Sequence, residues 1–283
     1  MAAQQFQQID YRPGRVARIT LDRPQYRNAQ SAVLLEEVDA ALHAAERDPE
    51  VKVVVVAGAG DAFSSGHDLG TPEQAAWLEA NRRDVTEAET HFDYSWEHFL
   101  TMSLRWRDIP KPTIAQVHGW CIFGGWLVAS SMDLIVAADD ARFMTALLQY
   151  FPLPFDVGPR RAKELLFDSH EISAEEALEL GFVNKVVPRD QLDDETQALA
   201  ERIARHNPFY LRMAKLSVNQ AQDAMGFRPA VTGAHSHYML SQLSNAQWAR
   251  KQGRPEREGR RLPLVDRILG EAAPAPDGGD APA

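Results

Sequence analysis

The residues best placed for chemistry are two adjacent glycines, Gly124 and Gly125, between a strand pattern and a helix pattern. An apolar, β-branched run over 113–117 predicts a buried strand, and a helix-like segment begins at Trp126. A strand, a glycine turn and a helix start place backbone N–H groups at the positive end of a helix dipole. This arrangement suits a developing negative charge, either a phosphate or the oxyanion of an acyl group. The alternative is that the glycines only let helix and strand pack closely.

A second loop, GAGDAFSSGHDL over residues 58–69, is rich in small residues. Small residues are needed where a backbone closely approaches a ligand or another strand. Phe63 and Leu69 bracket the small residues, which suggests that the loop is anchored at both ends. The alternative interpretation is an ordinary surface turn.

The elements that must position these loops follow from the hydrophobic pattern. The run 51–57 is short and almost wholly apolar, which is typical of a strand covered on both faces in a sheet built by right-handed crossovers. Ser173 and Glu176 form a capping box, and Asn207 precedes Pro208 at another helix start. The predicted strands are 15–21, 51–57, 113–118, 133–137 and 183–187. The predicted helices begin near residues 31, 73, 159, 173, 190, 208 and 230.

Composition limits the classes of function. The net charge of -10 argues against generic nucleic-acid binding, because a phosphate backbone would be repelled. The single cysteine, Cys121, excludes an internal disulfide and is expected to be a buried filler rather than a nucleophile. The N-terminus lacks the apolar core of a signal peptide, and no apolar run approaches the ~20 residues that span a bilayer. We therefore expect a cytoplasmic protein without membrane association.

Four segments, in this order and spacing, resemble the crotonase (enoyl-CoA hydratase/isomerase) superfamily. The resemblance covers the chain from about residue 10 to 250, and any one segment alone is a weak signal. The segments are LDRPQYRNAQS at 21–31, AFSSGHDL at 62–69, KPTIAQVHGWCIFGGWLVASSMDLIVAADDARF at 111–143 and GPRRAKELLFDSHEISAEEALELGFVNKVVP at 158–188.

The resemblance implies an α/β fold, a ClpP-like spiral of repeated ββα units followed by helices that assemble trimers or dimers of trimers. We expect the spiral core over 1–205 and the helical region over 206–250. The tail over 251–283 is charged and then Ala/Pro/Gly-rich, and is expected to be partly disordered. The family binds acyl-CoA thioesters, so coenzyme A would enter as part of the substrate. No metal or redox cofactor is implied.

The resemblance also assigns roles to residues. The oxyanion hole for the thioester carbonyl would use the backbone N–H groups of His67 and Gly124. Ser65, Asp68 and Leu69 lie in the loop that would meet the adenine end of CoA. Arg27 and Ala29 would lie along the pantetheine and phosphates. Trp126, together with Phe123, would reshape or narrow the acyl pocket.

The chain departs from the family at both catalytic glutamates. Their positions hold Leu127 and Leu147, neither of which can transfer a proton. Losing one acid/base typically removes a factor of ~10²–10⁴ in rate, so water addition by the usual route should be severely impaired. Asp156 lies where some divergent relatives, such as retro-Claisen hydrolases, supply a catalytic aspartate. Its alternative role is that of a helix N-terminal acid ahead of Pro159.

The histidines are weaker candidates. His118 ends a buried strand and is expected to be hydrogen-bonded structure. His235 and His237, with Tyr238, lie on a C-terminal helix that in this family can reach an active site, although a surface or trimer-contact role is expected for each.

Three functions follow from these features. The first is an enoyl-CoA hydratase-like lyase of fatty acid metabolism that stabilises a thioester enolate. The second is a hydrolase or C–C lyase that acts on a CoA ester or diketone with Asp156 as base. The third is a non-catalytic, trimeric acyl-CoA-binding protein.

Overall fold

The computed structural model describes residues 6–145 and 152–251 of the chain. Its contacts divide the chain into two compact units, residues 1–235 and 236–283. The two β-sheets and the described candidate residues from Arg27 to Asp156 belong to the first unit. Within the described residues, no helix is both long and apolar enough to cross a bilayer.

The larger sheet follows from the long apolar runs of the sequence. Its six strands are β1 (Ile9–Arg12), β2 (Val16–Leu21), β3 (Val53–Gly58), β5 (Thr113–Val117), β7 (Leu134–Ala138) and β10 (Lys185–Val187). They lie in the order β1-β2-β3-β5-β7-β10, with β1 antiparallel to β2 and the other pairs parallel. The five predicted strands are confirmed to within two residues. The first strand, β1, was not predicted.

A second, smaller sheet carries the candidate site at its ends. Its strands are β4 (Ala62–Ser64), β6 (Trp120–Ile122), β8 (Arg142–Met144) and β9 (Glu171–Ser173). The order is β4-β6-β8-β9, with β9 antiparallel to β8 and the other pairs parallel. Each strand has three residues, too few to show a hydrophobic period, which is why the sequence did not predict this sheet.

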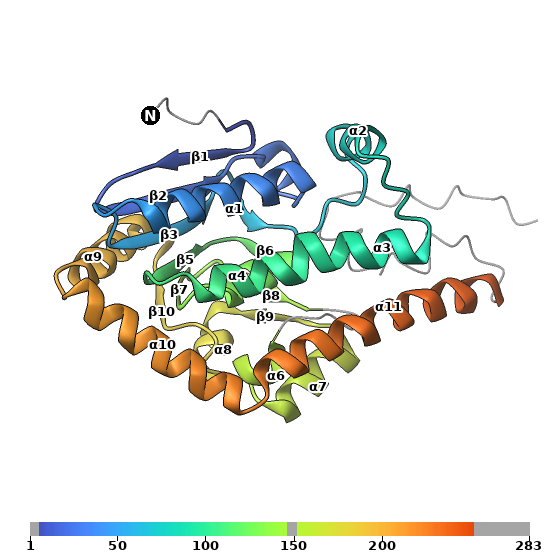
Figure 1. Cartoon of the computed structure of the whole chain (residues 1–283). Coiled ribbons are helices and arrows are strands. Elements are labelled where there is room, and N and C mark those ends of the chain that lie inside the picture. The colour runs from blue at the N-terminus through green and yellow to red at the C-terminus, as the bar shows by residue number, and fades with distance from the viewer. Residues whose placement is uncertain (1–5, 146–151, 252–283) are drawn as a thin grey trace, which may run out of the picture. The chain divides into compact units, whose positions relative to one another are not determined.

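Two of the helices in the first half, α1 (Ala32–Arg47) and α2 (Pro72–Ala80), begin after a residue whose side chain caps them. The other elements of this half are η1 (Pro24–Tyr26), α3 (Ala88–Ser95), η2 (Trp96–Thr101) and α4 (Met102–Asp108). Ser31 caps α1 by accepting a hydrogen bond from the Leu34 amide. Helix α1 packs along β1 and β2, whereas α3, the π-helical segment η2 and α4 form one continuous helical run (Figure 1).

The later helices cover the sheet and extend the chain. They are α5 (Gly124–Ser130), α6 (Leu153–Asp156), α7 (Pro159–Asp168), α8 (Ala174–Glu179), η3 (Arg189–Gln191), α9 (Leu192–Ala204), α10 (Pro208–Ala224) and α11 (Phe227–Lys251). The predicted caps at Ser173 and Asn207 are confirmed, because each side chain accepts a backbone N–H of its helix. Helices therefore dominate after residue 159, as predicted.

The core of the larger sheet lies against α9. Alternate residues of a strand face opposite sides, so Val53 and Val55 of β3 point to α9 while Val54 and Val56 point to the other face. All four are fully buried, as the unbroken apolar run predicted. The cluster beneath α9 consists of Val53, Val55, Ile114, Val136, Ala138, Val187, Leu192, Ala200 and Ala204.

Candidate active site

The glycine turn joins β6 to α5 through a strained residue. Phe123 has φ 51° and ψ -115°, an unusual conformation for a side chain larger than glycine, and its amide donates to the Met144 carbonyl. A Cβ atom on Gly124 would lie 2.3 Å from Gln30 Oε1, and one on Gly125 would lie 2.6 Å from the Ser64 carbonyl oxygen. Both positions therefore require glycine for close packing. This requirement leaves the chemical interpretation of the turn open.

The loop after β4 runs directly against this turn. Gly66 has a positive φ of 90°, and a Cβ atom on it would lie 3.0 Å from the Gly124 amide nitrogen. His67 is bridged to Gln30: the Gln30 amide donates to the Gly66 carbonyl at 2.8 Å, and the Asp68 amide donates to the Gln30 carbonyl at 3.1 Å. A residue held in this way by a parallel bridge directs its own N–H away from the bridging strand. The His67 amide thus points away from Gln30.

The His67 ring packs into the protein beside this turn. It stacks on Phe99, with 3.8 Å between ring centroids and 28° between planes. Burial lowers the pKa of His67 to about 3, and the nearby His91 contributes in the same direction. The imidazole is therefore neutral at physiological pH, so it adds no cationic charge to the site.

The side chain of Asp68 anchors the loop that follows β4. Its side chain is fully buried, and Oδ2 pairs with Arg23 Nη1 at 2.9 Å and accepts from the Thr71 hydroxyl at 2.6 Å. Burial alone would raise the pKa of Asp68, but hydrogen bonds from Thr71, Gly70 and Arg23 together lower it. The carboxylate is thus committed to the protein, so any contact of Asp68 with substrate would come from its backbone.

The other predicted binding residues differ in their exposure and in their hydrogen-bond partners. The Ala29 carbonyl accepts from Arg23 Nη1 at 2.6 Å, and the Ser65 amide donates to the Arg27 carbonyl at 2.9 Å. Leu69 is 85% exposed. Arg27 lines a hollow of about 340 Å³, whose other lining residues are Asp61, Ala62, Gly119, Trp120, Asp140 and Arg142.

Asp156 ends the short helix α6 and turns toward α5. Its Oδ2 accepts from the Ser130 hydroxyl at 2.7 Å and, more weakly, from the Trp126 indole N–H at 3.4 Å. Burial raises the pKa of Asp156 to about 7, against the opposing effect of these two hydrogen bonds. No side chain caps the N-terminus of α7, so the carboxylate does not cap the helix that begins at Pro159.

The α5 residues at positions 126 and 127 are apolar and buried. Trp126 is fully buried and stacks on Phe182 with 4.4 Å between ring centroids. Leu127, at the position of one family glutamate, is 4% exposed. Leu147, at the position of the other, lies outside the described residues. Sequence reasoning missed Ser130, although its spacing of four residues from Trp126 places both side chains on one face of α5.

The remaining candidates are structural. His118 Nε2 lies 3.0 Å from the Gly60 carbonyl oxygen, which confirms its expected hydrogen-bonded role. His235 is fully buried, with Nε2 2.8 Å from the Ser95 hydroxyl, whereas His237 is exposed. Cys121 is fully buried, and burial raises the pKa of its thiol well above the ordinary value, which fits a core filler rather than a nucleophile.

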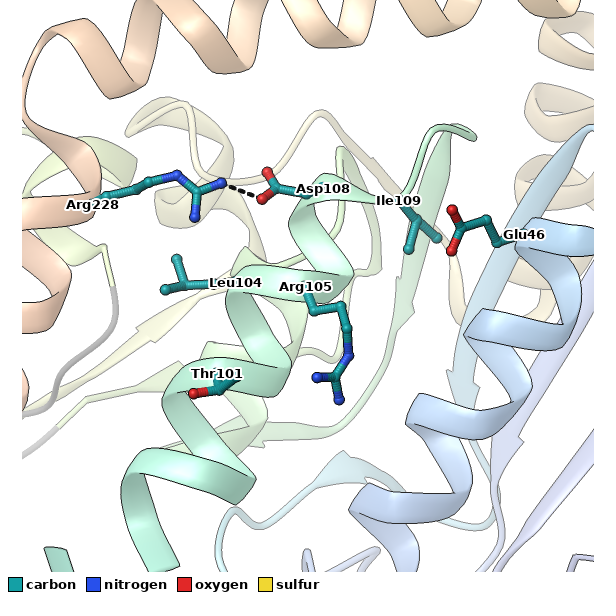
Figure 2. A pocket seen from close by; sticks show the side chains of 7 residues that line it. All are labelled: Glu46, Thr101, Leu104, Arg105, Asp108, Ile109 and Arg228. Carbon is teal, nitrogen blue, oxygen red and sulfur yellow. Dashed lines mark hydrogen bonds and ion pairs between the residues drawn. The ribbon is translucent and has the colours of Figure 1, made fainter. Parts of the chain in front are cut away.

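A separate hollow of about 440 Å³ lies away from these residues. Figure 2 shows its lining from α1, from the end of η2, from α4 and the residue after it, and from the start of α11, with Arg228 paired to Asp108. Arg105, another lining residue, pairs with Asp39 at 2.6 Å. None of the predicted site residues lines this hollow. Its lining residues are Glu46, Thr101, Leu104, Arg105, Asp108, Ile109 and Arg228.

Over residues 6–145 and 152–251, no group of three or more His, Cys, Asp or Glu side chains is arranged to hold a metal ion.

Comparison with known proteins relates this geometry to a family. Residues 12–247 match the family model of enoyl-CoA hydratase/isomerase. The chain is 40% identical, over 258 residues, to a putative enoyl-CoA hydratase of Mycobacterium tuberculosis, covering 85% of this chain and 80% of the relative. It is 32% identical, over 209 residues, to a hydroxycinnamoyl-CoA hydratase-lyase of Pseudomonas fluorescens, covering 71% and 73%.

Solved structures agree. A probable enoyl-CoA hydratase from Mycobacterium smegmatis superposes with a TM-score of 0.77 at 40% identity, covering 85% of this chain and 96% of that one. An enoyl-CoA hydratase/isomerase from Xanthobacter autotrophicus Py2 superposes with the same TM-score at 32% identity, covering 96% and 100%. The two sheets and their helices thus form the crotonase spiral. This chain belongs to the enoyl-CoA hydratase/isomerase family of the crotonase superfamily, and is an enzyme of that type.

Proposed function

We propose that the protein binds an acyl-CoA thioester, stabilises its enolate with the backbone N–H groups of His67 and Gly124, and moves a proton with Asp156. The observation that carries this proposal is the environment of Asp156. The carboxylate is buried, has a pKa of about 7, and is held by Ser130 and Trp126 of the helix that begins at Gly124. At neutral pH such a group exchanges a proton readily.

The position of Asp156 along α5 supports a role close to the oxyanion hole. Trp126 and Ser130 lie two and six residues after Gly124, which corresponds to roughly 3 and 9 Å along the helix axis. The carboxylate therefore lies beside the first two turns of α5. An acyl group whose carbonyl oxygen rests on the Gly124 amide would extend its α- and β-carbons into this region.

In the proposed reaction the Asp156 carboxylate takes a proton from the carbon next to the thioester carbonyl. The negative charge moves to the carbonyl oxygen, where two backbone N–H groups stabilise it. The protonated Asp156 then returns the proton to the α-carbon or, where the enolate is conjugated with a double bond, to the γ-carbon, and the carboxylate is regenerated. Preorganised donors of this kind are the largest single contribution in many acyl-transfer enzymes. Because Leu127 cannot act as a second acid or base, a reaction that takes and returns one proton suits this site better than water addition.

A second candidate is hydrolysis or C–C cleavage of a CoA ester or diketone, with Asp156 activating water or the substrate. The observation that favours it is the same buried carboxylate, which accepts from the Trp126 indole, together with a relative named as a hydratase-lyase. A protein that keeps the oxyanion hole but converts no substrate would instead be an acyl-CoA-binding protein. Coenzyme A enters these proposals as part of the ligand, except for a diketone substrate, and none of them needs another cofactor.

Arg27 is proposed to bind the CoA moiety. Its hollow of about 340 Å³ also contains Arg142, whose guanidinium group suits a phosphate. The hollow contains two carboxylates as well, Asp61 and Asp140, of which Asp140 is paired with Arg189.

The deciding experiment incubates the enzyme with short, branched and aromatic enoyl- and acyl-CoAs in D₂O and follows both products and α-proton exchange by NMR. Exchange that is lost in Asp156→Asn supports proton abstraction by Asp156. Release of free CoA favours the hydrolase. Binding without exchange or product favours the non-catalytic protein.

We also propose assembly through α10, as a homotrimer or hexamer. Helix α10 buries no side chain, although it carries Phe209 (65% exposed), Tyr210 (63%) and Val218 (68%). Apolar side chains of this size along one helix favour burial against a second copy. Sedimentation velocity at micromolar concentration tests the proposal, and a monomer would contradict it.

A further inference from the structure

Gln30 contacts both parts of the proposed oxyanion hole. It is 1% exposed and lies just before Ser31, the residue that caps α1. Through its backbone it forms the bridge that brackets His67, donating to the Gly66 carbonyl and accepting from the Asp68 amide. The direction of the His67 N–H is therefore fixed by the position of Gln30.

The side chain of Gln30 reaches the other donor. The position that a Cβ atom would occupy on Gly124 lies 2.3 Å from Gln30 Oε1 and 2.7 Å from His67 Nδ1. The Gln30 amide and the His67 ring thus fill the space against which the first residue of α5 rests. A single residue contacts the loop that carries one N–H and the glycine that carries the other.

The orientation of the Gln30 amide is set by Ser64. The Ser64 hydroxyl, fully buried, donates to the Asn28 carbonyl at 2.9 Å and accepts from Gln30 Nε2 at 3.2 Å and from the Gly66 amide at 3.1 Å. Because the hydroxyl hydrogen is directed to Asn28, Ser64 can only accept from Gln30. This assigns the NH₂ group to Ser64 and the carbonyl oxygen to Gly124.

We propose that Gln30 is a positioning residue that sets the separation and direction of the His67 and Gly124 N–H groups. The inference rests on the proposed function, in which these two groups bind the thioester oxygen. Donors act on a developing oxyanion only at 2.7–3.1 Å from the place the oxygen will occupy, so a displacement of about 1 Å removes much of their effect. Gln30 itself does not contact the substrate.

The test measures polarisation of a bound thioester carbonyl without requiring turnover. The probe is 4-(dimethylamino)cinnamoyl-CoA, whose absorbance shifts to longer wavelength when hydrogen bonds polarise its carbonyl. The variants are Gln30→Leu and Gln30→Met. Methionine keeps the length and flexibility of the side chain but not its amide, so it serves if the leucine variant fails to fold. The matched control is Gln116→Leu, which removes another buried amide whose oxygen accepts from Arg18 on the larger sheet.

The wild type and Gln116→Leu should show the full red shift. In the Gln30 variants the shift should fall to about half or less while the dissociation constant of the probe changes less than ~3-fold, because CoA contacts are unaffected. A Gln30 variant with the full shift would overturn the inference and leave the oxyanion hole intact. A wild type that binds the probe without any shift would overturn the proposed oxyanion hole itself. On the true substrate, kcat should fall by about 10-fold at unchanged KM.

Discussion

The two halves of the candidate site are held in place very differently. The loop that carries His67 is fixed by buried hydrogen bonds and by the buried Arg23–Asp68 ion pair. Asp156, in contrast, accepts one short and one long hydrogen bond from a single helix, α5, among the described residues. The loop proposed to polarise the carbonyl is thus anchored through several elements, whereas the described hydrogen bonds of the carboxylate proposed to move the proton come from α5 alone.

This difference distinguishes the backbone N–H groups, which the fold itself supplies, from the proton-transfer side chain, which can vary within the same fold. Backbone N–H groups cannot be removed by substituting most side chains, so carbonyl polarisation persists as long as the loop and the glycine turn keep their packing. A proton-transfer group needs only one side chain at a suitable place. The loop after β4 and the glycine turn keep their packing with Leu127 at position 127 and with a buried Asp156 nearby in α6. A crotonase can therefore lack a glutamate at position 127 and keep a folded site.

The largest effect is expected for Asp156→Asn. Because the amide cannot accept the proton, turnover should fall by ~10²–10⁴ while KM changes little. In the wild type kcat/KM should rise with pH through about 7, as the carboxylate ionises, and this limb should disappear in the variant. Steady-state kinetics from pH 5 to 9 measure both effects. Unchanged turnover on the true substrate would reject the role and leave a site without an acid or base of its own.

The ionisation of Asp156 should also affect folding stability, which should fall with rising pH over the range in which kcat/KM rises. The pKa of Asp156 is raised from 3.8 to about 7, so between these values the folded state binds a proton that the unfolded state has lost. The stabilising contribution is complete below pH 4 and is lost as pH rises through 7. Asp156→Asn removes this pH-dependent loss of stability. The melting temperature of the variant minus that of the wild type should therefore be more positive at pH 8 than at pH 5. Thermal unfolding at the two pH values is the measurement.

Gly124→Ala tests the other region. The added methyl group would lie 2.3 Å from Gln30 Oε1 and 2.7 Å from the His67 ring, so the turn or the loop must move. We expect a loss of ~10²–10³ in turnover, the cost of removing one oxyanion donor. Gly233→Ala, a helical position with open space around its Cβ, is the matched control and should keep full activity. A fully active Gly124→Ala enzyme would show that placement of this amide does not matter.

The buried ion pair provides a test by stability. Asp68→Asn leaves the Arg23 guanidinium buried without its carboxylate partner, which typically costs ~3–5 kcal/mol. Asp10→Asn breaks a surface pair with Arg12 and should cost ~0–1 kcal/mol. Urea unfolding of the two variants measures the difference. If both variants lose equally little free energy of unfolding, the loop is held by its remaining hydrogen bonds. The ion pair would then not distinguish this loop from the surroundings of Asp156.

The sequence predicted the parts of the fold that carry a local signal. The apolar runs of β3 and β5, the helix start near Ser31 and the caps Ser173 and Asn207 are local patterns, and all are confirmed. The three-residue strands of the smaller sheet carry no period and were missed. For the candidate site, the two glycines and the small-residue loop carried a local signal, and the structure brings them together. Gln30 and Arg23 could not be found, because their roles depend on pairing with residues 34 to 45 positions away.

The smallest effect is expected for His67→Ala, which separates backbone from side chain at one position. The substitution keeps the N–H group and removes a neutral ring that stacks on Phe99. If only the amide acts, kcat should fall less than ~10-fold, well below the loss for Gly124→Ala. Some of that loss is expected because the ring also fills the space beside Gly124. A loss of ~10²-fold or more, with a new pH dependence, would assign the imidazole a direct part in catalysis. The comparison of the two variants therefore measures how far this half of the site works through its backbone alone.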